Sequence, residues 1–484
     1  MFYNTLVYIE NFNQIKLRGI KMAKIHNFKL NFTSRIMNNL LILMGLVMAS
    51  VINSCGYIPN QTVSDNLESL KKEKEIYIAK YKNGATALIK ERKDTKAVSI
   101  QVWFGVGSVF ENDKERGLSH FLEHMLFNGT KYTKPGEIEA KVEEKGGYIN
   151  AATSKDYTFY YIEIASPFWK EALKYLYYMT TVPTLSQKMI EKEKPIVLEE
   201  LNRHLDNPKS KLWDRFYELA YKVSNYKYPV IGFRKTIEKF NEKLVKDYFY
   251  SHYVPSNTYI VVVGNINKDE VLKEIDKTWG SVKGKYYKPE KVPLEPKQTD
   301  IRNDTIKKKQ ITRAYVIIGW QAPSVKDKES FVGSVLEEIL FNGRTSIFYQ
   351  KLRETGLVNG IYGGYIGHRG TSQFIIYFIT APEKIDKVKA EIFKTLKEFR
   401  ENGIPKELVE NAKNRIVNRE VFAREEVSNE AENIGYAFSV VGNIDYELNF
   451  TKYIQDVKKE DVDKFLKKYI KDNNYTEVKL LPEK

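Results

Sequence analysis

The centre of this sequence is the stretch Gly117-Leu118-Ser119-His120-Phe121-Leu122-Glu123-His124-Met125-Leu126-Phe127. On a helical period of 3.6 residues, His120 and His124 lie one turn apart and Glu123 shares their face. The apolar positions can face a core: Leu118, Leu122, Met125 and Leu126. Asn128-Gly129 follows directly and marks the end of the helix. The stretch therefore predicts one short amphipathic helix with two imidazoles and a carboxylate on its polar face.

This polar face has the chemistry of a zinc site. Two imidazoles at positions i and i+4 can bind one metal ion at about 2.0–2.1 Å, and a carboxylate between them can take a proton from a metal-bound water. The order H-x-x-E-H is the inverse of the common H-E-x-x-H zinc motif. Only six histidines occur in the chain, so a chance pairing on a surface helix is the weaker alternative. We therefore predict that His120 and His124 bind zinc and that Glu123 acts on the bound water.

Length and composition indicate a globular protein. A chain of 484 residues suggests two to three domains, and 42% hydrophobic with 13% aromatic residues is ample for packed cores. The net charge of +15 would fit nucleic acid or an anionic membrane, but glutamates are scattered among the lysines. We find no nucleic-acid-binding motif, and we interpret the charge as a solvated surface.

The only cysteine, Cys55, directly follows an apolar run over residues 37–54. A basic region before that run and small Ser54 before the cysteine are typical of a bacterial lipoprotein signal, cleaved before Cys55 and lipidated there. The apolar run is too short to span a membrane comfortably. We expect a leader over residues 1–54, a polar tether over 55–74, and a lipid anchor at Cys55 on the extracytoplasmic side of a bacterial envelope membrane. The alternative is a buried or incidental cysteine.

Strand and helix signals then place a first domain at residues 75–282. Segments 76–82 and 85–91 flank Asn83-Gly84, a strong hairpin signal. Further strands are expected over residues 98–104, 148–153, 158–165 and 259–264. Beside the motif helix, helices are expected from Pro135 to Gly146, over residues 186–205, and after residue 264 to Trp279. Residues 283–309 carry three prolines among many charges and predict a linker.

The second half, residues 310–484, repeats the first. Leu126-Phe127-Asn128-Gly129 recurs as Leu340-Phe341-Asn342-Gly343, an offset of 214 residues. At this offset His120, Glu123 and His124 become Ser334, Glu337 and Glu338, so the second copy cannot hold zinc in the same way. We predict an α+β fold of two homologous domains, each a mainly antiparallel sheet backed by helices, which close as a clamshell.

At this point the sequence resembles the insulinase/pitrilysin family of zinc metallopeptidases, in particular the smaller two-domain branch that includes the mitochondrial processing peptidase β subunit and bacterial relatives. The resemblance runs from about Ile76 to the C-terminus. It is carried by residues 116–130, Gly146-Gly147-Tyr148-Ile149-Asn150-Ala151, residues 193–200, Tyr228-Pro229-Val230-Ile231-Gly232 and Tyr253-Val254-Pro255.

The resemblance implies a complete zinc site. His120 and His124 match the family's histidine ligands, Glu123 its general base, and Glu200 its distal ligand. Glu193 matches the catalytic-site glutamate that supports the ligands from just outside the set. Two alternatives stand beside Glu200: its neighbour Glu199, and His204 one turn further along, for which a capping or surface role is the other interpretation.

The resemblance also implies how substrate is held. The family strand that matches residues 146–151 adds an extended substrate as an extra β-strand, with Asn150 and Ala151 against its backbone; an ordinary turn and strand is the alternative. Arg353 matches a family arginine of the second domain, but Asn359 stands where the family has tyrosine. This leaves Tyr362, or a partner chain in a homodimer or heterodimer, to complete that half of the site.

Taken together, these features predict an envelope-anchored zinc endopeptidase with one Zn²⁺ per chain, acting on peptides or unfolded protein segments. The alternative is a non-catalytic assembly or scaffold subunit, which this family also contains.

Overall fold

The computed structural model describes residues 66–284, 286–287 and 291–483. The predicted leader, Cys55 and most of the predicted tether lie outside these residues. Among the described residues, no helix combines the length and apolar character that a membrane crossing requires.

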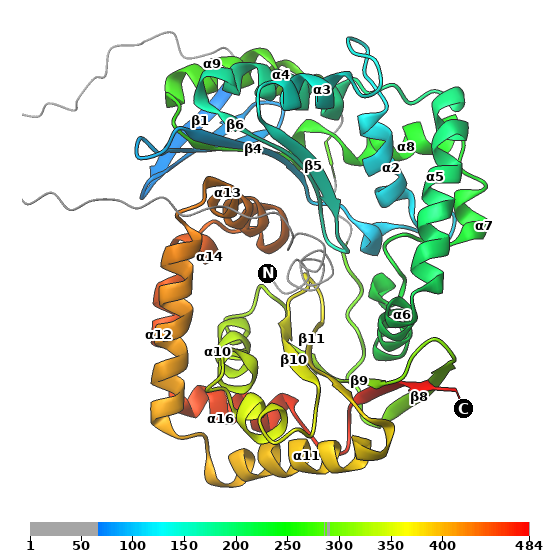
Figure 1. The fold of residues 1–484 in the computed structure, drawn as a ribbon. Helices are drawn as coiled ribbons and strands as arrows, with labels where there is room; N and C mark the ends of the chain where they lie inside the picture. The colour runs from blue at the N-terminus through cyan, green and yellow to red at the C-terminus, as the bar shows by residue number, and fades with distance from the viewer. Residues whose placement is uncertain (1–65, 285, 288–290, 484) are drawn as a thin grey trace, which may run out of the picture. The chain divides into compact units, whose positions relative to one another are not determined.

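The first sheet has seven strands in the order β1-β2-β3-β7-β4-β6-β5 (Figure 1). The strands are β1 Leu67–Glu73, β2 Ile76–Tyr81, β3 Thr86–Glu91, β4 Ala97–Phe104, β5 Tyr148–Thr153, β6 Thr158–Ala165 and β7 Thr258–Gly264. All neighbours are antiparallel except β3 and β7. The predicted hairpin at Asn83-Gly84 and the other predicted strands are confirmed.

Helices cover both faces of this sheet. The first half contains α2 Leu118–Phe127, α3 Glu137–Glu144, α4 Trp169–Thr181, α5 Gln187–Asp206, α6 Pro208–Ala220, α7 Arg234–Ile237, α8 Glu242–His252 and α9 Lys268–Lys277. Helices α4 and α9 pack on one face. Central strand β7 is almost entirely buried, as expected for a strand covered on both sides.

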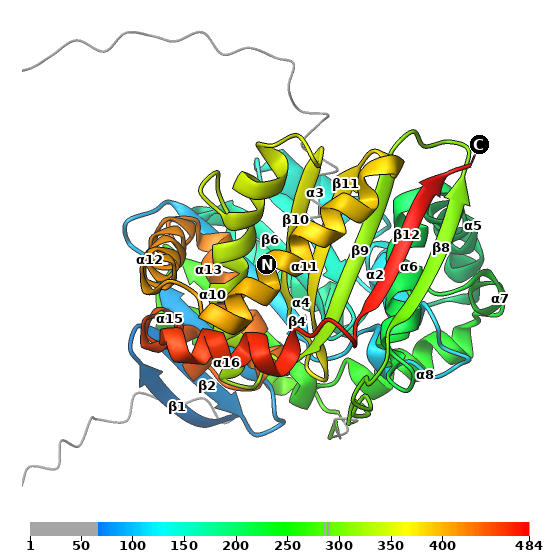
Figure 2. The same cartoon turned by 90° about the horizontal axis from the view of Figure 1, so that it is seen from below.

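The second sheet has five strands in the order β10-β11-β9-β12-β8 (Figure 2). They are β8 Arg302–Lys308, β9 Ala314–Ala322, β10 Gly360–Ile366, β11 Ser372–Thr380 and β12 Thr476–Pro482. The order repeats β5-β6-β4-β7-β3 of the first sheet, including the single parallel pair, here β12 with β8. The predicted internal repeat and the mainly antiparallel sheets are therefore confirmed.

Each half lends one helix to the sheet of the other. The second half contains α10 Glu329–Phe341, α11 Ile385–Asn402, α12 Lys406–Ala423, α13 Val427–Tyr436, α14 Asp445–Leu448, α15 Phe450–Asp456 and α16 Lys459–Tyr469. Helix α13 packs on β4 and β7 of the first sheet, and α6 packs on β9 and β12 of the second. In the first contact, a Cβ atom at Gly435 would lie 2.3 Å from the buried Trp103 ring. The two halves therefore share apolar cores.

Two predicted boundaries are wrong. Strand β1 lies inside the predicted tether, residues 55–74, and β8 lies inside the predicted linker, residues 283–309. Both are edge strands with many exposed side chains, so neither shows a sustained apolar period, and backbone pairing to a neighbour defines them instead. The second half therefore begins at Arg302 rather than at residue 310.

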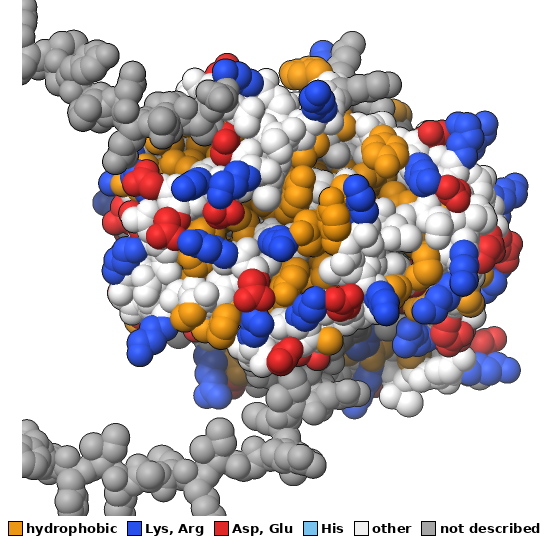
Figure 3. All heavy atoms as spheres, turned by 90° about the horizontal axis from the view of Figure 1, so that it is seen from above, with side chains coloured by type: hydrophobic (Ala, Val, Ile, Leu, Met, Phe, Trp, Pro, Cys, Tyr) orange, Lys and Arg blue, Asp and Glu red, His pale blue; other side chains and the backbone are white. Residues whose placement is uncertain are grey.

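The surface mixes both signs of charge. On the face shown in Figure 3, Lys and Arg side chains alternate with Asp and Glu, and hydrophobic side chains lie between them. Many of the lysines pair with acidic residues one helical turn away, as Lys141 does with Glu137 and Lys246 with Glu242. This pattern fits the predicted solvated surface.

Candidate metal centre

Helix α2 places the two histidines on its polar side because its other side is buried. Leu118, Phe121, Leu122, Met125 and Leu126 are fully buried in the core of the first half. The predicted amphipathic helix is confirmed.

The start of α2 is fixed by a buried carboxylate. Glu111 accepts hydrogen bonds from the backbone N–H groups of Gly117 and Ser119, both at 2.8 Å. Burial raises the pKa of Glu111 to about 7, although these hydrogen bonds oppose the rise. Gly117 has a φ of +93°, and a Cβ atom there would lie 2.5 Å from the Ile231 carbonyl oxygen. Only glycine fits this turn into the helix.

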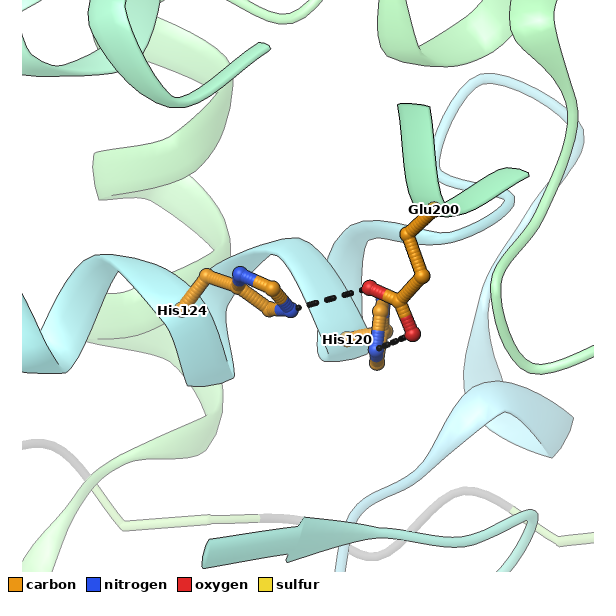
Figure 4. Close-up of side chains that lie close together, drawn as sticks. All are labelled: His120, His124 and Glu200. Carbon is orange, nitrogen blue, oxygen red and sulfur yellow. Dashed lines mark ion pairs between the residues drawn. The ribbon is translucent and has the colours of Figure 1, made fainter. Parts of the chain in front are cut away.

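Helix α5 packs against α2 and brings a third donor to the histidines. Its buried face carries Ile190, Glu193, Val197 and Leu201. Glu200 lies two helical turns after Glu193, and its carboxylate points at both imidazoles (Figure 4). Pro195 lies on the exposed side, and the helix continues through it.

The three side chains have the spacing of a zinc site. The carboxylate oxygens of Glu200 lie 3.6 Å from His120 Nε2 and 3.3 Å from His124 Nε2. All three ligand atoms lie within 4.8 Å of one another. Donors about 2.0–2.1 Å from one tetrahedral zinc ion lie about 3.3–3.5 Å apart. Two imidazoles and one carboxylate are also a donor set that zinc uses when the fourth position is left for water. The residues therefore fit zinc.

Glu193 supports this arrangement from behind His124. Its Oε1 atom lies 3.0 Å from His124 Nδ1, and its Oε2 atom accepts a hydrogen bond from Asn128 Nδ2 at 2.6 Å. Burial would raise the pKa of Glu193, but the contacts with His124 and Asn128 outweigh it and lower the pKa. When Nδ1–H donates to Glu193, the Nε2 lone pair of His124 is left for a metal.

The electrostatics of the two imidazoles differ. Burial lowers the pKa of His120 to about 4, so this ring is neutral and able to bind a metal. Burial acts in the same direction on His124, but hydrogen bonds to Glu193 and Glu200 raise its pKa to about 9. The carboxylates of Glu193 and Glu200 thus make this site favourable for a cation.

Glu123 lies on α2 next to the donors and is not one of them. Its Oε2 atom accepts a hydrogen bond from the hydroxyl of Thr153, at the end of β5. Burial raises the pKa of Glu123, and the Thr153 hydrogen bond opposes the rise. A buried carboxylate beside a metal site, with a raised pKa, is suited to accept and return a proton.

The structure separates the alternative ligands from this group. Glu199 is exposed, and its carboxylate lies 3.4 Å from the Asn202 amide. His204 Nε2 pairs with Asp214 at 2.7 Å. Packing of α5 on α2 therefore brings Glu200 to the imidazoles, and neither Glu199 nor His204.

The predicted substrate strand is an open edge beside α2. Strand β5 pairs with β6 on one side and is the last strand of its sheet. Asn150 is exposed on it and accepts a hydrogen bond from the Ala151 N–H at 2.9 Å, while Ala151 is half-buried. Helix α2 packs next to this strand. An unpaired edge of this kind can accept an extended peptide as a further strand.

The predicted contributions from the second half are not joined to the metal centre. Arg353 lies exposed at the end of the helical turn Tyr349–Arg353, and Tyr362 lies on β10 with its ring stacked on Tyr377. Within the described ranges, no hydrogen bond or ion pair links either side chain to His120, His124 or Glu200. Their role in substrate binding stays a prediction.

Sequence reasoning missed two residues of this centre. Thr153 and Asn128 each donate a hydrogen bond to a site glutamate. Both residues lie at the ends of elements that the sequence predicted: Asn128 ends the motif helix, and Thr153 ends the strand over residues 148–153. Only the polarity of these two side chains, next to apolar segments, could have indicated a role in the site.

The second copy carries an ion-pair cluster where the first has imidazoles. On α10, Glu338 is buried and accepts hydrogen bonds from Arg415 at 2.8 Å and Arg419 at 2.7 Å, both from α12. Helix α12 is the counterpart of α5. Within the part of the chain that the structure describes, the only group of three metal-binding side chains is that of the first half.

Glu337, the counterpart of Glu123, should make the stability of the protein depend on pH. Burial raises its pKa to about 8, against hydrogen bonds from Tyr365 N–H and the Asn342 amide. Between pH of about 4.5 and 8 the folded chain keeps a proton that the unfolded chain releases. The free energy of unfolding therefore falls as pH rises through this window, by up to about 1.4 kcal/mol per pH unit from this group.

Glu337→Gln should remove this contribution. We would measure the free energy of unfolding of the metal-free protein in urea at several pH values. It should fall less steeply with rising pH in the variant than in the wild type. Glu199→Gln, at an exposed position, is the control and should keep the wild-type slope. Equal slopes for Glu337→Gln and the wild type would contradict the assignment.

Comparison with known proteins agrees with this geometry. Residues 86–233 match the family model described as Insulinase (Peptidase family M16), and residues 239–416 match the model described as Peptidase M16 inactive domain. The uncharacterized zinc protease YmxG of Bacillus subtilis is 30% identical over 334 residues, which cover 68% of this chain and 80% of that protein. The chain belongs to the M16 peptidase family. The histidine-bearing helix lies in the first of the two matched regions.

A solved structure shows the same fold over most of its length, and a further relative matches in sequence over about half of its length. The crystal structure of a protease from Helicobacter pylori superposes with a TM-score of 0.78 at 25% identity, covering 83% of this chain and 98% of that one. The mitochondrial-processing peptidase subunit beta of Bos taurus is 28% identical over 230 residues, 46% of this chain and 47% of that protein. Relatives named zinc proteases support an M16 metallopeptidase that binds zinc.

Proposed function

We propose that this M16 protein is a zinc-dependent endopeptidase that hydrolyses peptides or unfolded protein segments. One zinc ion per chain would be held by His120, His124 and Glu200. The observation that carries the proposal is the convergence of three donors from two helices, with Glu193 behind His124.

The residues of the centre divide the chemistry of peptide hydrolysis between them. A bound zinc ion supplies an acidified water and polarises the scissile carbonyl. Glu123 takes the proton of the attacking water and returns it to the leaving amine. Glu193 holds the imidazole of His124 in one tautomer and orientation. The hydroxyl of Thr153 holds the carboxylate of Glu123.

An extended segment would bind along the free edge of β5. Main-chain hydrogen bonds to Asn150 and Ala151 would hold it with little reading of its side chains, which predicts loose sequence preference and a need for unfolded substrate. Arg353 would add a contact from the second half. Because Asn359 stands where the resemblance implies tyrosine, we propose that Tyr362 or a partner chain, in a homodimer or heterodimer, completes this contact.

We also propose that the enzyme is anchored in the bacterial cell envelope by lipid on Cys55. Support comes from the apolar run and small residue before that cysteine. Mass spectrometry of the mature N-terminus tests the location: acylated Cys55 supports it, and an intact leader before an unmodified Cys55 contradicts it.

Cleavage of a library of unstructured peptides by the purified mature chain tests the proposed activity. Cleavage should stop after zinc removal with a chelator and return when one equivalent of zinc is added, because the proposed mechanism needs the zinc ion to acidify the attacking water. A stably folded protein offered as substrate in place of the unstructured peptides should resist cleavage. Binding of the peptides without any zinc-dependent cleavage would favour the non-catalytic scaffold subunit instead.

A further inference from the structure

The hydrogen bond from Thr153 to Glu123 ends a chain of contacts that begins in the second half of the molecule. Thr153 is the last residue of β5, and the turn 154–156 follows it before β6. We propose that Thr153 is a positioning residue that orients the carboxylate of Glu123, and that Arg369 of the second half holds Thr153 in place through this turn. The inference rests on the proposed peptidase function.

The turn 154–156 is held from within the first half by close backbone packing. The N–H groups of Ser108 and Val109 donate to the carbonyl oxygens of Ser154 and Lys155 at 3.2 and 2.9 Å. A Cβ atom at Gly107 would lie 2.3 Å from the Ser154 oxygen, so the two backbones meet only because residue 107 is glycine. The strand end that carries Thr153 therefore has no room to shift towards this loop.

Lys155 fixes the same turn from a second direction. Its buried ammonium donates to the carbonyl oxygens of Tyr226 and Tyr228 at 2.9 and 2.7 Å, and it lies 4.4 Å from the centre of the Tyr217 ring. A buried ammonium that lost these carbonyl partners would be costly. The backbone on either side of Lys155 is thus tied to the segment after α6.

Asp156 connects the turn to the second half. Its buried carboxylate accepts hydrogen bonds from the hydroxyl of Tyr226 at 2.6 Å and from the N–H of Arg369 at 3.2 Å. The imidazole of His368 stacks on the Tyr226 ring and lies 3.3 Å from the same carboxylate. His368 and Arg369 lie in the turn between β10 and β11, the counterpart of the turn 154–156 in the repeat.

Arg369 joins three separate backbone segments. Its guanidinium donates to the carbonyl oxygens of Asp156 at 3.2 Å, Gly105 at 3.3 Å and Ser439 at 2.5 Å. Gly105 follows β4, and Ser439 follows α13, the helix that the second half lends to the first sheet. The charge therefore holds the turn after β5 at a fixed place relative to the core beneath it.

Kinetics on an unstructured peptide test the first step. Thr153→Val keeps the shape of the side chain and removes the hydroxyl, so kcat should fall by about 10²-fold with KM and zinc content unchanged. Thr153→Ser keeps the hydroxyl and should recover most of the loss. Wild-type kcat in Thr153→Val, or equal damage in Thr153→Ser, would overturn the role of Thr153.

A double variant tests the second step. Arg369→Ala as a single change should lower kcat. Added to Thr153→Val, it should lower kcat little further, because both changes act on the carboxylate of Glu123. If the fold-loss in kcat of the double variant equals the product of the two single fold-losses, Arg369 does not act through Thr153. Arg419→Ala is the control, since it removes an arginine side chain of the second half that contacts Glu338 and not the turn 154–156; its kcat should equal that of the wild type.

A thermal-unfolding measurement, which does not depend on enzymatic activity, separates this inference from the proposed function. In the metal-free chain, Thr153→Val should lower Tm by about 2 °C when Glu123 is present and leave it unchanged or higher in Glu123→Ala. Equal shifts in both backgrounds would refute the contact. A wild type without chelator-sensitive cleavage would refute the peptidase proposal, and the Tm comparison would still decide whether Thr153 holds Glu123.

Discussion

Glu123→Gln should keep the proposed zinc ion and lower kcat for peptide cleavage by about 10³-fold. Glutamine has almost the same size as glutamate, and its amide oxygen can still accept the hydrogen bond from Thr153. It cannot take a proton from water at neutral pH, so the proposed general base would be lost. Zinc binding should remain because Glu123 is not among the three candidate donors. Steady-state kinetics on an unstructured peptide, with zinc content from atomic absorption, make the measurement.

The internal repeat supplies a matched control for this change. Glu337 occupies the position of Glu123 on α10, is also half-buried, and has no imidazole at the counterpart positions Ser334 and Glu338. Glu337→Gln should therefore cleave at the wild-type rate. Turnover by Glu123→Gln at more than a few per cent of the wild type, with zinc bound, would remove Glu123 as the general base.

Glu200→Gln should release the proposed zinc ion and abolish peptide cleavage. Glu200 is the one donor that comes from α5, and its carboxylate contacts both imidazoles. An amide carries no charge to offset the cation, so zinc affinity should fall by more than the 10- to 100-fold loss typical of a partner just outside the ligand set. Equilibrium dialysis against a chelator of known affinity measures the change, and cleavage should drop to the level of the zinc-free chain.

Two neighbours on α5 give a graded comparison. Glu193→Gln removes the partner of His124 but no donor to the metal, so zinc affinity should fall by about 10- to 100-fold. Glu199→Gln alters an exposed residue next to Glu200 and should change neither affinity nor activity. Should Glu199→Gln lose zinc while Glu200→Gln retains it, the register of α5 on α2 would be wrong.

The second half is more than an inactive copy of the first. It has no imidazoles on α10, in keeping with the inactive domain that its family model describes. It nevertheless covers the first sheet with α13 and reaches the turn after β5 with Arg369. The exchange of α6 and α13 means that neither half has a closed apolar core by itself.

Much of the architecture was predictable from the sequence because its signals are local. Alternation over β4 to β6, the Asn83-Gly84 turn and the helical period of α2 each depend on residues a few positions apart. Strands β1 and β8 were missed for the complementary reason. They are edge strands, and each pairs with only one neighbour, β1 with β2 and β8 with β12. No local period in the sequence reveals which segment that neighbour is.

The sequence by itself determined that two imidazoles and a glutamate share one face of a helix, because spacing along a helix sets direction. It also determined that the second copy lacks the imidazoles. Only the tertiary structure decided that Glu200 and not Glu199 meets them, that Thr153 and Asn128 hold the two site glutamates, and that Arg369 reaches the turn after β5. Those contacts join segments 30 to more than 200 residues apart, and packing of whole elements, which no local pattern encodes, brings them together.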